Sequence, residues 1–154
     1  MHPDVELASL EYPLDGLLQI QDVVEEDELR HPTMLDTTGV ESIFVVKNGS
    51  ATGLTVGRAT AFESFVREYD RNTIRSTSVM MAIYPYSHND GAFTAPGIPG
   101  PSSLTDSTGR VVGILTGSAG RGGENDVSYA TPYYWLEERV KRAFPDSYLY
   151  STIA

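Results

Sequence analysis

Short runs of β-branched and aromatic residues alternate with glycine, proline and asparagine along most of this chain. From residue 42 onward such runs recur about every ten residues. Runs of this length between turn residues are typical of antiparallel strands, whereas a parallel sheet would need helices between its strands. The expected strands are 42–46, 52–57, 61–69, 78–86, 102–106, 110–116 and 127–130.

The first two runs are separated by a strong hairpin signal, Asn48-Gly49. In the tight turns that join antiparallel strands, both central residues take positive φ, which asparagine and glycine tolerate best. We therefore expect the chain to reverse at this dipeptide.

One helix is predicted near the C-terminal end, over residues 133–144. Thr131 can cap it, Pro132 suits its first position, and Pro145 ends it. Its apolar residues recur every four positions: Leu136, Val140 and Phe144. Charged residues four positions apart form the pairs Glu137–Lys141 and Glu138–Arg142. The predicted fold is all-β: a single six- to seven-stranded antiparallel barrel with a C-terminal helix and an acidic N-terminal segment.

Charge divides the chain near residue 40. The net charge of the 154 residues is −10, and residues 1–46 hold eleven acidic residues against Arg30 alone. The sequence thus predicts an acidic, linker-like segment over residues 1–40 and a barrel domain over residues 41–150. Within the acidic segment, residues 25–29 predict a short helix that stops before His31-Pro32. No internal repeat is apparent.

Several classes of function find no support in the composition. The chain has no cysteine, its three histidines are scattered, and no glycine-rich loop has phosphate-binding spacing, so neither a metal nor a cofactor is expected. No face is basic, and no apolar run has the length of a membrane span, so neither nucleic acid nor a membrane is an expected partner. No signal peptide is visible, so the localisation is unknown, with the cytoplasm as the default.

Three stretches in order resemble one protein family. They are KNGSATGLTVGRAT (47–60), FTAPGIPGPSSLTDSTGRVVGILTG (93–117) and NDVSYATPYYWLEERVK (125–141). Together they resemble the second, C-terminal barrel of trypsin/chymotrypsin-like serine proteases, of the type found in fungi and bacteria. The resemblance covers roughly residues 40–150 and implies half of a two-barrel fold and a relation to serine endopeptidases.

The position of the nucleophile departs from that family. The resemblance places the nucleophilic serine of the family's Gly-Asp-Ser-Gly motif at Pro99, or at Gly100 in a register shifted by one. Neither residue has a hydroxyl, and Pro99 also lacks the N–H that the family's serine donates to the oxyanion hole. Ile98 replaces the family's aspartate. The family's histidine and aspartate belong to a first barrel, for which the forty residues before the first hairpin are too few. We therefore expect no catalytic residue in the family's positions.

Three residues are weak substitutes for the missing catalytic groups. Ser102 and Ser103 follow the turn and could act as a displaced nucleophile, and His88 could act as a base. Each has a simpler structural interpretation: the serines as hydroxyls at the start of a strand, and the histidine as a solvated loop residue.

The sequence leaves three hypotheses about function. The first is a non-catalytic, protease-like domain that binds an extended peptide by β-addition along the old substrate cleft. The cleft residues implied by the resemblance are Gly97, Gly100, Thr116, Gly117 and Ser118. The second is an active serine-type hydrolase that uses Ser102. The third is a truncated product without selected activity, whose exposed barrel face would bind a missing first barrel or form a homodimer.

Overall fold

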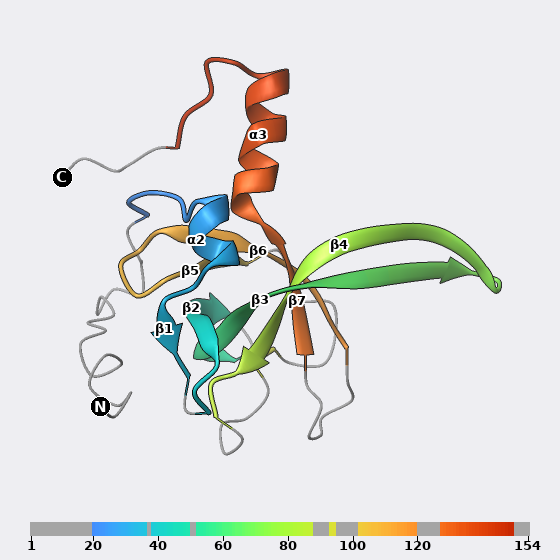
Figure 1. Cartoon of the computed structure of the whole chain (residues 1–154). Coiled ribbons are helices and arrows are strands. Elements are labelled where there is room, and N and C mark those ends of the chain that lie inside the picture. The colour runs from blue at the N-terminus through green and yellow to red at the C-terminus, as the bar shows by residue number, and fades with distance from the viewer. Residues whose placement is uncertain are drawn as a thin grey trace.

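Six of the strands in the described part of the chain close into an antiparallel barrel (Figure 1). The structure, a computed structural model, describes residues 20–36, 38–49, 52–87, 93–94, 102–119 and 127–149. In chain order its elements are α2 (Glu26–Arg30), β1 (Met34–Leu35), β2 (Glu41–Gly49), β3 (Gly53–Asp70), β4 (Thr73–Pro85), β5 (Ser103–Thr105), β6 (Val111–Ala119), β7 (Val127–Pro132) and α3 (Tyr133–Ala143). Neither helix is long and apolar enough to cross a membrane.

The barrel is closed by a pairing between strands that are far apart in the chain. The sheet order is β1-β2-β3-β4-β7-β6-β5, and β2 pairs with β5 where Val46 lies opposite Thr105. Strands β2 to β7 thus form a ring, while β1 lies beside the first residues of β2. Every pairing between these strands is antiparallel. The predicted all-β fold, a single antiparallel barrel with a C-terminal helix, is confirmed.

The core fills the inside of this ring. Each barrel strand contributes at least one buried apolar side chain, among them Val45, Ala59, Ile83, Leu104, Val112, Leu115 and Ala130. Phe93, which precedes the glycine- and proline-rich turn, also lies in the core and is 1% exposed. Its ring packs where Gly57 has no side chain: a Cβ there would lie 2.9 Å from the ring and 2.8 Å from Ile83.

The β2–β3 hairpin was predicted correctly, but its turn was not. Asn48 pairs with Leu54 and Gly49 with Gly53, so Asn48-Gly49 forms the end of β2 and the reversal follows it. Gly53, with φ of 64°, takes the left-handed conformation that was expected at Asn48 and Gly49. The pairing of the β2 and β3 side chains over eight positions fixes the register and overrides the local turn signal.

The strands predicted over 52–57 and 61–69 are one strand, β3, and it forms a long arm with β4. The pairing is irregular between Ala59 and Glu63, where β3 leaves the barrel. Beyond that point β3 and β4 extend together away from the other elements (Figure 1). The arm ends in the two-residue turn Arg71-Asn72, whose φ values of 46° and 71° are those of a tight hairpin turn.

Two five-residue segments before β2 and β6 share the sequence pattern Asp-x-Thr-Gly and the hydrogen bonds of their aspartates. They are Asp-Thr-Thr-Gly-Val (36–40) and Asp-Ser-Thr-Gly-Arg (106–110). In each loop one carboxylate oxygen accepts hydrogen bonds from the threonine N–H, the threonine hydroxyl and the N–H of the fifth residue. Each aspartate is buried and ion-paired, with Arg58 in the first loop and Arg110 in the second. The aspartates of the two loops therefore make the same local hydrogen bonds.

The described part of the acidic segment packs on the barrel. The predicted short helix is present as α2, and Val24 and Leu29 are buried in the core cluster. The Val24 N–H donates to the carbonyl of Val111 at the start of β6 (2.9 Å). Arg110 also binds Glu28 through two hydrogen bonds of 2.7 and 2.6 Å. Residues 20–36 are thus joined to the barrel by backbone, apolar and charged contacts.

The C-terminal helix is present as α3, with two corrections. Thr131 does not cap it, because Thr131 pairs with Ile114 as part of β7, and Pro132 takes the cap position without a side-chain hydrogen bond. The predicted apolar stripe is not buried, and Val140 and Phe144 are exposed. The two predicted ion pairs are present, with distances of 2.6 and 2.7 Å.

Candidate functional site

Among the described residues, the second half of β6 is paired on one side only, and we call this its open edge. At its beginning β6 is paired on both sides, with β5 and with β7. The last contact on the β5 side is the hydrogen bond from the Leu115 N–H to the Ser102 carbonyl (2.9 Å). From Thr116 to Ala119 the described residues place only β7 beside it. The sequence-predicted residues Thr116, Gly117 and Ser118 all lie on this open edge.

The described residues of this edge differ in their surroundings. Thr116 is a bulge between two paired positions, and its hydroxyl donates to the Tyr129 carbonyl (3.0 Å). Gly117 is half-buried, and no atom lies within 4 Å of where its Cβ would be. Ser118 pairs with Ser128 across the sheet.

The described residues that flank the glycine- and proline-rich segment in sequence, 93–94 and 102, contact the barrel. On one side Phe93 is in the core, and the Thr94 hydroxyl lies 2.9 Å from the buried Ser128 hydroxyl. On the other side, Ser102 is tied to Leu115. The four residues that carried the missing-nucleophile prediction lie outside the described residues: Gly97, Ile98, Pro99 and Gly100.

Two of the three weak catalytic candidates, Ser102 and Ser103, are among the described residues. Ser103 is exposed in β5 and pairs with Ile114 in the sheet, and Ser102 immediately precedes that strand. His88 lies outside the described residues. The one histidine among the described residues, His31, follows α2, where its imidazole lies 3.7 Å from Asp27. No catalytic role is assigned to any of them.

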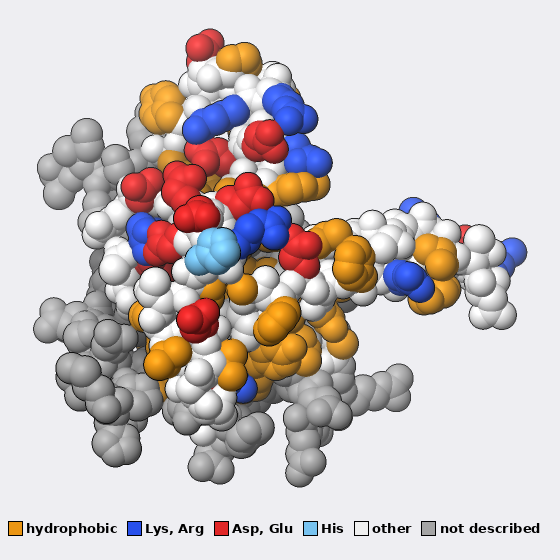
Figure 2. All heavy atoms as spheres, in the orientation of Figure 1, with side chains coloured by type: hydrophobic (Ala, Val, Ile, Leu, Met, Phe, Trp, Pro, Cys, Tyr) orange, Lys and Arg blue, Asp and Glu red, His pale blue; other side chains and the backbone are white. Residues whose placement is uncertain are grey.

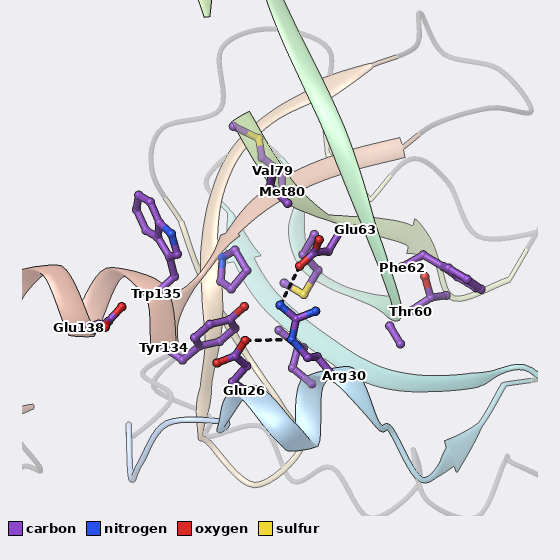
Figure 3. A pocket seen from close by; sticks show the side chains of 14 residues that line it. Glu26, Arg30, Thr60, Phe62, Glu63, Val79, Met80, Tyr134, Trp135 and Glu138 are labelled. Atoms are coloured by element: carbon purple, nitrogen blue, oxygen red, sulfur yellow. Dashed lines mark hydrogen bonds and ion pairs between the residues drawn. The ribbon is translucent and has the colours of Figure 1, made fainter. Parts of the chain in front are cut away.

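A hollow lies at the base of the arm, between α2, the arm and the start of α3 (Figure 3). Its volume is about 320 Å³. We call it the arm-base pocket, and its lining residues of greatest chemical interest are Glu26, Arg30, Glu63, Val79, Trp135 and Glu138. The Arg30 guanidinium bridges two of the carboxylates, with bonds of 2.9 Å to Glu26 and to Glu63. Three carboxylates against one guanidinium give the lining a negative balance.

Local charges and burial shift two pKa values in this pocket. Hydrogen bonds to Glu26 and Glu63 raise the pKa of Arg30, so this guanidinium keeps its charge. Burial, assisted by the charge of Glu26, raises the pKa of the Tyr134 phenol. The pocket therefore combines fixed negative charge with aromatic surface.

The sequence pointed to neither the arm nor its pocket. Both depend on how far β3 and β4 pair beyond the barrel, and on α2 and α3 meeting at the base of the arm. One signal was available: no glycine, proline or asparagine separates the runs 52–57 and 61–69, which together are longer than an ordinary strand.

Among the described residues, no three histidine, aspartate or glutamate side chains are grouped so that they could hold a metal ion. The chain matches no protein-family model, and no curated protein sequence matches it.

Proposed function

We propose that this chain is a non-catalytic, serine-protease-like domain that binds an extended peptide along the open edge of β6. One observation carries the proposal: from Thr116 to Ala119, the described residues pair with β6 on the β7 side only. An edge strand presents unpaired backbone donors and acceptors, and a peptide in extended conformation satisfies them by adding a strand.

The order of elements supports the protease-like part of the proposal. β5, β6 and β7 follow one another in the chain, and β7 passes directly into α3 at Pro132–Tyr133. This is the order that the three stretches resembling the protease family predicted. The open edge also falls at the residues to which the resemblance assigns substrate pairing.

The absence of catalysis rests on the chemistry of Pro99 and Gly100. Neither side chain has an atom that can attack a carbonyl carbon, and acyl transfer also needs a base in hydrogen-bond reach. Binding through backbone groups needs neither.

Peptide binding can be tested with an array of random decapeptides and the purified full-length chain. We expect some extended sequences to bind. N-methylation of a bound peptide should abolish binding at every second residue only, because alternate N–H groups of an added strand face the protein. Equal tolerance of N-methylation at all positions would contradict strand addition.

A fluorophosphonate probe tests the non-catalytic part separately. We expect no covalent labelling of the chain, as judged by intact mass. Stoichiometric labelling of Ser102 or Ser103 would instead support the active hydrolase.

A further inference from the structure

The most deeply buried residues that line the arm-base pocket belong to the barrel core. Leu29 of α2 and Met81 of β4 are members of the core cluster, and they are 7% and 4% exposed. Tyr134, which also lines the pocket, packs against the same cluster. The volume of about 320 Å³ lies within the range of about 300–1,000 Å³ that is typical of small-molecule sites. The pocket is therefore formed by the fold itself and is large enough for a small ligand.

Aromatic and apolar side chains form much of the remaining lining. Tyr134 and Trp135 contribute from the start of α3, and Val79 and Met80 contribute from β4 (Figure 3). The Arg139 guanidinium stacks on the Trp135 ring, 3.2 Å from its centroid, and this contact helps to fix the ring. A lining of this kind favours a ligand with an apolar body, above all an aromatic one.

A charged cluster lies beside this apolar surface. The Arg30 guanidinium donates to one oxygen of Glu26 and one oxygen of Glu63, each at 2.9 Å (Figure 3, dashed lines). Two carboxylates against one guanidinium leave an excess of one negative charge. The third carboxylate of the lining, Glu138, is paired with Arg142 at 2.7 Å, so it does not add to this excess.

The two carboxylates of the cluster each keep an acceptor atom. Both use Oε1 to bind Arg30, and among the described residues nothing donates to Oε2 of Glu26 or of Glu63. Carboxylate oxygens form their strongest hydrogen bonds with charged N–H donors. The cluster therefore lacks one cation that carries N–H groups, and the pocket beside it has room for the body of such a cation.

The surface around the pocket is acidic as well. The first turn of α2 carries Glu26, Asp27 and Glu28, and Figure 2 shows red side chains gathered beside the root of the arm. Arg110 pairs with Glu28 and removes part of this charge. Charge of one sign around a hollow raises the local concentration of ions of the opposite sign. The approach of a cation is thus favoured over that of an anion.

We propose that the arm-base pocket binds a small organic amine in its protonated form. The ammonium group donates hydrogen bonds to Glu26 and Glu63 and supplies the positive charge that the cluster lacks. The apolar body of the amine lies against Tyr134, Trp135 and Met80. None of the described lining residues belongs to the open edge of β6, so this proposal and peptide binding can fail separately.

Three probes that share one aromatic body test the requirement for charge. They are phenethylamine, phenethyl alcohol and hydrocinnamate, which end in an ammonium, a hydroxyl and a carboxylate group. Trp135 is the only tryptophan of the chain, so its fluorescence reports directly on the pocket. We expect the full-length chain to bind the amine with a Kd of about 1 mM or below. The alcohol should bind at least about fivefold more weakly, and the carboxylate should not bind. No saturable binding of the amine, or equal affinity for amine and alcohol, would overturn the proposal.

Substitutions in the cluster test the assigned carboxylates. Glu63→Gln removes the excess charge but keeps an acceptor, so it should weaken amine binding at least about threefold and leave the alcohol unchanged. Glu68→Gln is the matched control, because Glu68 lies on the same strand but does not line the pocket. It should change the affinity for neither probe. Equal losses of amine binding in the two variants would show that overall charge, and not the pocket, attracts the amine.

The apolar wall predicts a different pattern of losses. Trp135→Ala should weaken the amine and the alcohol by the same factor, about fivefold, because both lose the same contact. Val140→Ala, at an exposed position of the same helix, should weaken neither. Amide chemical shifts of an isotopically labelled chain measure these affinities without the tryptophan. In the unmodified chain, phenethylamine should shift the amides of residues 26–30, 60–63 and 132–138. Shifts confined to other parts of the chain would place the amine elsewhere and overturn the assignment.

Discussion

At the scale of single residues, two glycines of the barrel have different surroundings. Gly57 is buried where β3 passes Ile83 and Phe93, and the space of its missing side chain is filled by theirs. Gly117 lies on the open edge of β6 with no neighbour near its Cβ position. The sequence shows the same residue at both positions, and only the surrounding atoms distinguish them.

Gly57→Ala should therefore lower the free energy of unfolding by about 1–3 kcal/mol, because a methyl group 2.8–2.9 Å from Ile83 and Phe93 overpacks the core. Chemical denaturation measures this. Gly117→Ala is the matched control and should have an effect below about 0.5 kcal/mol. An equal loss in both variants would mean that the alanine side chain, and not the core contact, causes the change.

At the scale of elements, the arm and the barrel are separable although they share two strands. All members of the core cluster lie outside residues 60–80. The arm is held by its own cross-strand pairs. The core cluster therefore does not depend on the outer part of the arm.

A shortened arm should leave the barrel intact. Val66 lies opposite Ser78, so replacing residues 67–77 with Asn-Gly closes a tight turn between paired positions. We expect the free energy of unfolding to change by less than about 1 kcal/mol. Unfolding of this variant would show that the arm supports the barrel.

At the scale of the whole molecule, the acidic segment is part of the folded unit over residues 20–36. Leu29 of α2 is 7% exposed within the core cluster, and Arg110 ties α2 to the loop before β6. The negative charge of α2 is thus displayed on the barrel beside the arm-base pocket.

Leu29→Ala should destabilise the whole chain by about 2–5 kcal/mol in a single cooperative transition, because it leaves a cavity in the shared core. Leu35→Ala, at a leucine that is 55% exposed, should cost less than about 0.5 kcal/mol. Thermal or chemical unfolding followed by tryptophan fluorescence and by circular dichroism measures both. Separate transitions in the Leu29 variant would mean that α2 folds independently of the barrel.

The sequence by itself determined the local structure. Alternation of apolar and polar residues identified the strands, and a period of four with flanking prolines identified α3, because these patterns act between residues that are close in the chain.

Only the tertiary structure decided how the strands are joined and what the remaining surfaces do. Closure of the barrel depends on Val46 and Thr105, which are far apart in the chain. The reversal after β2 follows Asn48-Gly49 instead of occurring at it, because strand pairing outweighed the local turn signal. The arm-base pocket needs α2, β3, β4 and α3 to meet at one place. Such contacts follow from the packing of the whole chain, and no local pattern in the sequence encodes them.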